Sequence, residues 1–270
     1  MSARQEISIN SDAIKDIALR GVRRAVAFLC LGLQATRNGL PTSVVLDSKF
    51  VIQWFPDPLP SELARELSGE YESWIIGSAL KELDQYFGMF LNEIWGWMRM
   101  IEFHGKALPP GFGPDKKFID DTNVARKLSH VEKSLGVKAG IGSDFFNDYS
   151  LARNALSHNV GIVRDRDAND AGMLVIRWHA PTLVIKSEGE EHIFDQTSGL
   201  TDRVFGAESQ VVFRMRERSA KFVVGERIAL SRFDLSEICF SYQNAADTLT
   251  KEFVEYLVAK GVILDTPVSA

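Results

Sequence analysis

The sequence has no excess of positive charge and no uninterrupted apolar run long enough to cross a membrane. Its 270 residues include 31 Lys and Arg against 36 Asp and Glu, a net charge of −5. Proteins that bind nucleic acid without regard to sequence are usually basic, so this balance argues against that class but allows a small local phosphate site. The apolar region 74–103 is interrupted by Lys81, Glu82, Asp84, Glu93 and Arg99. We therefore expect a cytoplasmic protein with no membrane partner.

Several common site signatures are also missing. Cys30 and Cys239 are too few and too far apart for a disulfide framework, and we interpret both as reduced core thiols. No Cys and His cluster has zinc-ligand spacing, and the acidic residues Asp165, Asp167 and Asp170 are more typical of a polar loop than of a cation site. No phosphate-binding glycine loop and no nucleophile elbow is present. The sequence thus predicts no metal and no cofactor.

Apolar residues that recur at steps of three and four predict several amphipathic helices. The longest pattern runs from Ser61 to Ile101, where about ten turns share one stripe that we interpret as core. Trp74 belongs to this stripe, and Trp95 and Trp97 widen it. Polar residues that can cap free backbone amides predict the other helix starts at Ser11 or Asp12, Asp121 or Thr122, Ser143 or Asp144, and Asp234 with Glu237 three residues on.

The pattern changes after residue 163, where β-branched and aromatic residues gather between turn residues. Segments 173–178, 182–185, 211–213 and 221–224 predict a small antiparallel sheet. The alternating stretch 214–218 indicates a solvated strand face rather than a nucleic-acid platform. We expect a mainly α protein with this sheet between the helix near 143–156 and the C-terminal helix, α+β overall. The chain 1–270 is predicted to be one domain, with 171–228 as a β appendage.

One segment carries residue types suited to chemistry. Between Asp148 and Val163 lie Arg153, the polar Asn154 and, four residues later, His158. An arginine, a polar residue and a histidine in this order resemble the signature of the HEPN superfamily, whose name stands for "higher eukaryotes and prokaryotes nucleotide-binding". The flank 159–163, the segment 224–230 and the order of the predicted helices are also similar to that family.

The resemblance implies a HEPN-like helical bundle and a metal-independent endoribonuclease that cuts single-stranded RNA. In that reaction a 2′-hydroxyl attacks the adjacent phosphate and leaves a 2′,3′-cyclic phosphate. His158 suits proton transfer, since imidazole exchanges protons near neutral pH, and Arg153 suits the phosphorane charge. Asn154 shares a helix face with His158 and is expected to fix the imidazole or contact the RNA. Family members act in stress, defence or toxin–antitoxin settings, which implies an antitoxin or another regulatory partner.

The spacing of the motif bears on assembly. Arg153 and His158 are five residues apart, which is roughly 140° around a straight helix. A shared site then requires that the helix ends near Ser157, that the arginine's length closes the gap, or that two chains contribute. The resemblance favours the last, because the family typically dimerises with both motifs facing one cleft. We therefore expect a homodimer with a composite site.

Further RNA contacts are expected from Asn159, Arg164 and Arg166, which follow the motif. Val160 stands where some HEPN toxins carry a tyrosine that a partner nucleotidyltransferase modifies, so regulation by that route is not expected.

Two alternatives stay open at the level of sequence. A HEPN-fold protein can bind RNA or proteins as a scaffold without cutting. The motif can also be coincidental, with Arg153 paired to Asp148 on the preceding turn and His158 capping a helix C-terminus, where a cation is favoured.

Overall fold

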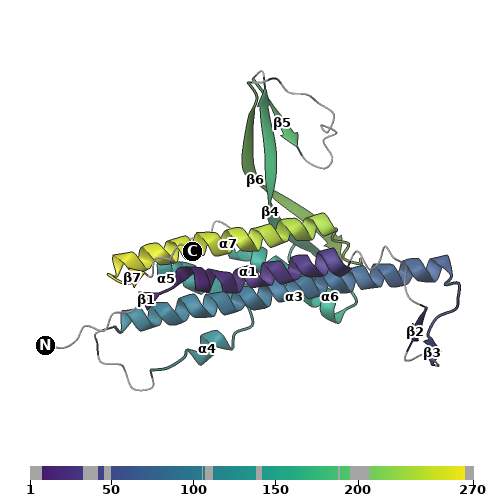
Figure 1. Ribbon diagram of the computed structural model, residues 1–270, viewed down its shortest axis with the longest axis horizontal. Coiled ribbons are helices and arrows are strands. Elements are labelled where there is room, and N and C mark those ends of the chain that lie inside the picture. The colour runs from purple at the N-terminus through teal and green to yellow at the C-terminus, as the bar shows by residue number, and fades with distance from the viewer. Residues whose placement is uncertain are drawn as a thin grey trace.

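The structure is a computed structural model that describes residues 8–32, 42–45, 50–104, 106, 112–137, 142–187, 189–194, 206 and 208–264. It is mainly helical with small antiparallel sheets, which confirms the expected α+β class. Three long helices lie side by side, and shorter ones pack against them (Figure 1). These helices are α1 (Ser11–Ala27), α3 (Ser61–Glu102), α4 (Lys116–Ile119), α5 (Val124–Leu135), α6 (Ser143–His158) and α7 (Arg232–Ala259).

Short elements complete the helical body. The π-helical turn Phe28–Gly32 continues α1, and the 3-10 turn Asp165–Asp167 follows α6. Strand β1 (Ser8–Ile9) pairs in parallel with β7 (Ile263–Leu264), which brings the start of α1 next to the end of α7. Strands β2 (Ser43–Val45) and β3 (Val51–Gln53) form a separate antiparallel pair.

An aromatic cluster joins α3, α6 and α7. The ring of Phe87 stacks on Phe146 at 4.8 Å between centroids, and Phe146 meets Tyr242 edge-on at 4.9 Å. All three side chains are buried. Offset and edge-to-face pairs of this kind stabilise a core beyond the area that they bury. The cluster therefore fixes α6, the helix of the motif, between two long helices.

The five predicted helices are present and α4 was not predicted, but none of the four predicted caps is the observed one. Near the starts of α1, α5 and α7 more than one polar residue could cap the helix, and packing decides which one does. The first turn of α6 has no side-chain cap, since Gly142 precedes it. The observed caps are Asn10 for α1, Asn123 for α5 and Ser231 for α7, where Asp234 is the third helical residue.

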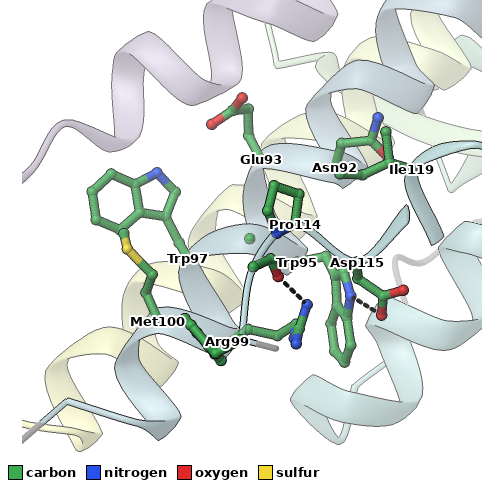
Figure 2. Close-up of a pocket in the computed structure, with 12 residues that line it drawn as sticks. Asn92, Glu93, Trp95, Trp97, Arg99, Met100, Pro114, Asp115 and Ile119 are labelled. Atoms are coloured by element: carbon green, nitrogen blue, oxygen red, sulfur yellow. Dashed lines mark hydrogen bonds between the residues drawn. The ribbon is translucent and has the colours of Figure 1, made fainter. Parts of the chain in front are cut away.

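The apolar stripe of α3 is buried only in part. Trp74 is 59% exposed, so its assignment to the core was wrong, and fully buried positions begin at Ile75. The N-terminal end of α3 extends beyond α1 and α7, so neither of these helices covers it (Figure 1). Towards the other end, Trp95 and Trp97 are half-buried and line a pocket of about 560 Å³ (Figure 2).

The β appendage is a three-stranded sheet that projects from the helices (Figure 1). Strand β4 (Met173–Ser187) pairs with β6 (Gln210–Val223) along its whole length, and β5 (Glu190–Phe194) pairs with the other edge of β4. The sequence predicted four short strands, but each long strand runs through its interruption, including Pro181. The stretch 214–218 is exposed, as predicted. Residues 195–205 of the predicted appendage lie outside the described residues.

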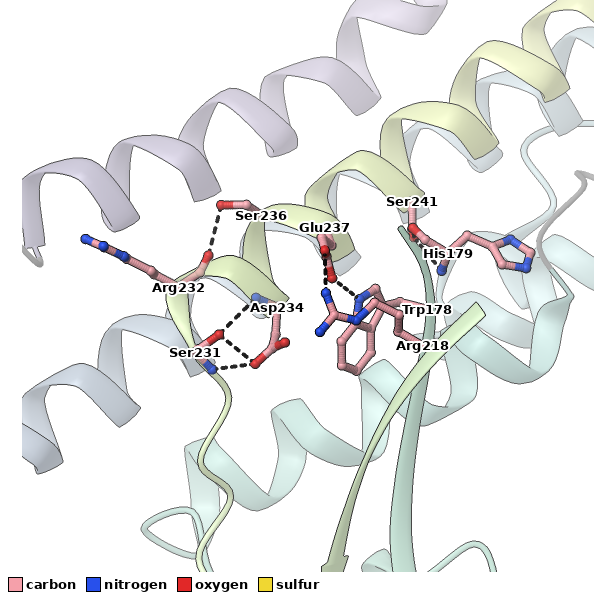
Figure 3. Close-up of polar contacts among 9 residues, drawn as sticks. All are labelled: Trp178, His179, Arg218, Ser231, Arg232, Asp234, Ser236, Glu237 and Ser241. Carbon is pink, nitrogen blue, oxygen red and sulfur yellow. Dashed lines mark hydrogen bonds and ion pairs between the residues drawn. The ribbon is translucent and has the colours of Figure 1, made fainter. Parts of the chain in front are cut away.

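Polar contacts with α7 hold the base of this sheet (Figure 3). The Trp178 indole nitrogen donates to Glu237 at 2.7 Å, and the Arg218 guanidinium donates to the same carboxylate at 2.8 Å. The Ser241 hydroxyl donates to the His179 carbonyl at 2.9 Å and accepts from its amide at 3.2 Å. Because Trp178 is 1% exposed, the base of the sheet belongs to the core and only its distal half stands free.

Candidate functional site

Helix α6 carries the predicted motif and lies close against α3. A Cβ atom added at Gly77 of α3 would be 3.0 Å from the Cβ atom of Leu156, so glycine permits this approach. The approach places the Arg153 side of α6 over the middle of α3. There Asp84 is 1% exposed.

Asp84 is the partner of Arg153. The Nη1 atom of Arg153 donates to Oδ2 of Asp84 at 2.8 Å, the Ser150 hydroxyl donates to the same oxygen at 3.1 Å, and the Tyr242 hydroxyl donates to Oδ1. Burial raises the pKa of Asp84, while Arg153, Tyr242 and Ser150 oppose that rise. Three donors thus converge on one buried carboxyl group. This group holds the Arg153 guanidinium from the side of α3.

The predicted partner of Arg153, Asp148, is engaged elsewhere. It is 1% exposed and accepts from Nε of Arg177 at 2.8 Å and from the Asn169 amide at 2.6 Å. Burial raises the pKa of Asp148, and its bonds to Arg177 oppose that rise. The Asp148–Arg177 pair joins α6 to β4, so the alternative in which Arg153 pairs with Asp148 is wrong.

The guanidinium of Arg153 is held in two directions. Its Nε and Nη2 atoms donate to Oδ1 of Asn154 at 3.3 and 2.9 Å, in addition to the bond from Nη1 to Asp84. A guanidinium has five N–H donors, so two remain without a partner among the described residues. The side chain is 23% exposed. A planar cation with two open donors can bind two oxygens of one phosphate.

A cavity of about 290 Å³ lies beside Arg153 and is lined by two lysines as well. Lys81 is exposed on α3, and Lys127 on α5 is 5% exposed. The Lys127 Nζ atom donates to Oδ1 of Asn92 and to the Ile119 carbonyl, each at 2.9 Å. Burial lowers the pKa of Lys127, and nearby aspartates oppose that change. The cavity therefore has three cationic groups from three helices against two carboxylates, those of Asp84 and Asp121. The excess of positive charge suits an anion.

His158 lies apart from this cavity. It is the last residue of α6 and is exposed, and its ring has no hydrogen bond or ion pair with the described part of the chain. The helix ends at His158, one residue after Ser157, which agrees with the alternative in which it ends near that residue. Arg153 and His158 leave the helix on different sides, whereas Asn154 and His158 share a face one turn apart.

The flank of the motif forms a closed turn. Asn159 is 4% exposed, its Nδ2 atom donates to Asp167 at 3.2 Å, and its Oδ1 atom accepts from Arg166 at 3.3 Å. The backbone amide of Arg164 donates to the same Asp167 at 3.0 Å. The side chains of Arg164 and Arg166 are exposed. Of the three expected RNA contacts, the two arginines are thus accessible and Asn159 serves the turn.

Comparison of the chain with protein-family models, with curated proteins and with solved structures finds no match. Within the described residues, His, Cys, Asp and Glu side chains nowhere gather in threes that could hold a metal ion. In the same residues no helix is long and apolar enough to cross a bilayer.

The sequence missed the lysines of the cavity. A lysine on an amphipathic helix is usually solvated, and only the packing of α5 on α3 shows that Lys127 is nearly buried. The interruption of the α3 stripe by Asp84 was visible, however. A charged residue at a core position of a long helix is a signal for a buried partner, and Arg153 is that partner.

Proposed function

We propose that this chain is a metal-independent endoribonuclease with a HEPN-like helical bundle, acting on single-stranded RNA in a stress, defence or toxin–antitoxin setting. One observation carries the proposal. The guanidinium of Arg153 is fixed by the buried Asp84 while two of its donors stay open beside a cavity that Lys81 and Lys127 also line. A preorganised cluster of cations is what the charge of a phosphorane requires.

The reaction assigns a task to each group. The 2′-oxygen attacks phosphorus and loses its proton, the bond from phosphorus to the 5′-oxygen breaks, and that oxygen gains a proton. Arg153 would hold two equatorial oxygens, where negative charge grows. Asn154 orients the guanidinium. His158 would transfer the protons, because its ring is exposed and available.

The direction in which the His158 side chain leaves α6 favours a site to which two chains contribute. An α6 that is regular to its last residue turns Arg153 and His158 about 140° apart. In a homodimer, His158 of one chain can approach the phosphate held by Arg153 of the other. Such a twofold arrangement gives two equivalent sites.

Cleavage in excess EDTA tests the proposal. Labelled single-stranded RNA is incubated with the purified protein, and the products are analysed for 2′,3′-cyclic phosphate ends. We expect cleavage that Arg153→Ala and His158→Ala both lower by about 100-fold or more, as for loss of one transition-state donor or acid–base group. Arg177→Ala and His104→Ala are the matched controls, since each removes the same residue type outside the cavity. Cleavage that survives Arg153→Ala would refute the proposal.

Sharing of the site between chains has its own test. The inactive variants Arg153→Ala and His158→Ala are mixed under conditions that exchange subunits. If each site takes arginine from one chain and histidine from the other, mixed dimers contain one intact site and activity returns in part. A mixture that stays inactive although light scattering shows mixed dimers would place both residues in one chain.

A second function is a scaffold without catalysis. The free half of the β4–β6 sheet exposes Val211, Phe213 and Met215 on one face, with Phe213 74% exposed. Contiguous exposed apolar residues usually mark an interaction surface. Under this function wild-type protein leaves RNA intact in the EDTA assay, and Phe213→Ser rather than Arg153→Ala disrupts its complexes.

A further inference from the structure

A second and larger pocket lies next to the cavity beside Arg153, further along α3. The pocket of about 560 Å³ lies between the C-terminal half of α3 and segment 112–119 (Figure 2). Asn92 and Ile119 line both this pocket and the cavity beside Arg153. The two hollows are therefore neighbours along one helix.

The walls of the larger pocket are aromatic and held in place. The Trp95 indole donates to Asp115 at 3.2 Å, and the Arg99 guanidinium donates to the Gly113 carbonyl at 2.9 Å while it lies 5.2 Å from the centre of the Phe112 ring. Figure 2 shows the Trp97 indole beside Met100 at the rim. A pocket of this size suits a ligand as large as a nucleotide.

The sign of the charge distinguishes the two pockets, since the cavity beside Arg153 has three cations against the carboxylates of Asp84 and Asp121. The larger pocket has one cation, Arg99, against the carboxylates of Glu93 and Asp115. Hydrogen bonds to Phe118 and Trp95 and the charge of Arg99 outweigh burial and lower the pKa of Asp115, which keeps it ionised. This pocket is thus unsuited to phosphate and suited to an uncharged aromatic group. The cations lie in the neighbouring cavity.

We propose that the pocket lined by Trp95, Trp97 and Phe112 binds a nucleobase of the same RNA strand whose phosphate lies at Arg153. This inference rests on the proposed function and adds a base-binding subsite to it. From Asp84 to Gly96 the helix rises about 18 Å. Stacked nucleotides advance about 3.4 Å each, so the base lies at most about five nucleotides from the bound phosphate.

Binding of RNA to tryptophan variants tests the subsite. Fluorescence anisotropy with a labelled single-stranded RNA is measured in a His158→Ala background, where the strand is expected to stay intact, and a gel verifies its length. Trp97→Ala is expected to weaken binding about 5- to 100-fold, as loss of one stacked base does, and Trp97→Phe to restore most of it. Trp74→Ala is the matched control, since it removes an exposed tryptophan of the same helix outside the pocket.

Two further arms identify the ligand. A strand of the same length with abasic sites throughout should bind wild-type protein at least as weakly as the intact strand binds the Trp97→Ala variant. Trp97→Ala should also leave the salt dependence of binding unchanged, while Arg153→Ala should lower its slope by about one.

The outcomes of these measurements test the base-binding subsite and the nuclease activity independently. Equal binding by the Trp97→Ala and Trp74→Ala variants would overturn the subsite even if the protein cleaves RNA. A specific loss with Trp97→Ala in a protein that never cleaves would keep the subsite and refute the nuclease. Binding of a free mononucleotide as tight as that of the strand would also overturn the inference, because the pocket would then serve a small molecule.

Discussion

Replacing Asp84 by asparagine tests whether the buried carboxyl group fixes Arg153. The two side chains have nearly the same volume, so the change leaves no cavity. It removes the charge that lies 2.8 Å from Nη1 of Arg153, and it leaves a single oxygen for donors that now occupy both oxygens. Breaking a buried ion pair from one side costs about 3–5 kcal/mol. Because Arg153 is 23% exposed and regains some water, we expect about 3 kcal/mol.

Urea unfolding followed by circular dichroism measures this loss. With a slope of about 3 kcal/mol per molar urea for a chain of this size, the midpoint should fall by about 1 M. Asp148→Asn is the matched control, since it breaks the similar pair with Arg177 outside the cavity. Both variants should lose stability, but only Asp84→Asn should slow RNA cleavage. A loss of free energy below about 1 kcal/mol for Asp84→Asn would refute the claim that this group holds the arginine.

Three further predictions concern packing, capping and acid stability. Gly21→Ala should destabilise by about 1–3 kcal/mol in urea unfolding, because its Cβ atom would lie 2.7 Å from that of Tyr86, while Gly69→Ala, with open space around it, should stabilise by up to about 1 kcal/mol. Ser231→Ala should lower the free energy of unfolding by about 1 kcal/mol through loss of the capping box, and an unchanged value would contradict the cap. The pKa of Asp115 is lowered from 3.8, so its contribution is present above that pH and lost as pH falls through the folded value; indole emission should report this acid step, and Asp115→Asn should remove it.

The spacing of apolar residues predicted the helices well, because apolar residues that recur with the helical period are mostly the ones that the fold buries. It failed at Trp74, where the stripe continues but α1 and α7 do not reach it. The first residues of the helices were harder to predict. Asp234 is a plausible N-cap in the sequence, but in the structure Ser231 is the N-cap of α7. The short apolar segments also predicted too short a strand for β4. The strand continues through Pro181 because it pairs with β6 on both sides of that residue.

The candidate site was predictable only in its local part. Arg153, Asn154 and His158 form a short pattern within one helix, and the sequence shows it directly. The partner Asp84 is 69 residues away, and Lys127 reaches the cavity only because α5 packs on α3. Trp95 and Trp97 matched the pattern of core residues, since periodicity cannot distinguish a buried ring from one at the wall of a pocket.

Strand β6 is an outer edge of its sheet over fourteen residues, and long exposed edges tend to recruit strands from other molecules. Arg214, Arg216 and Arg218 occur at alternate positions along it, and Arg214 and Arg218 form ion pairs with Glu191 and Glu237. Within the described part of the chain this edge is therefore both unpaired and charged, and charged side chains on an edge strand oppose its pairing with another molecule.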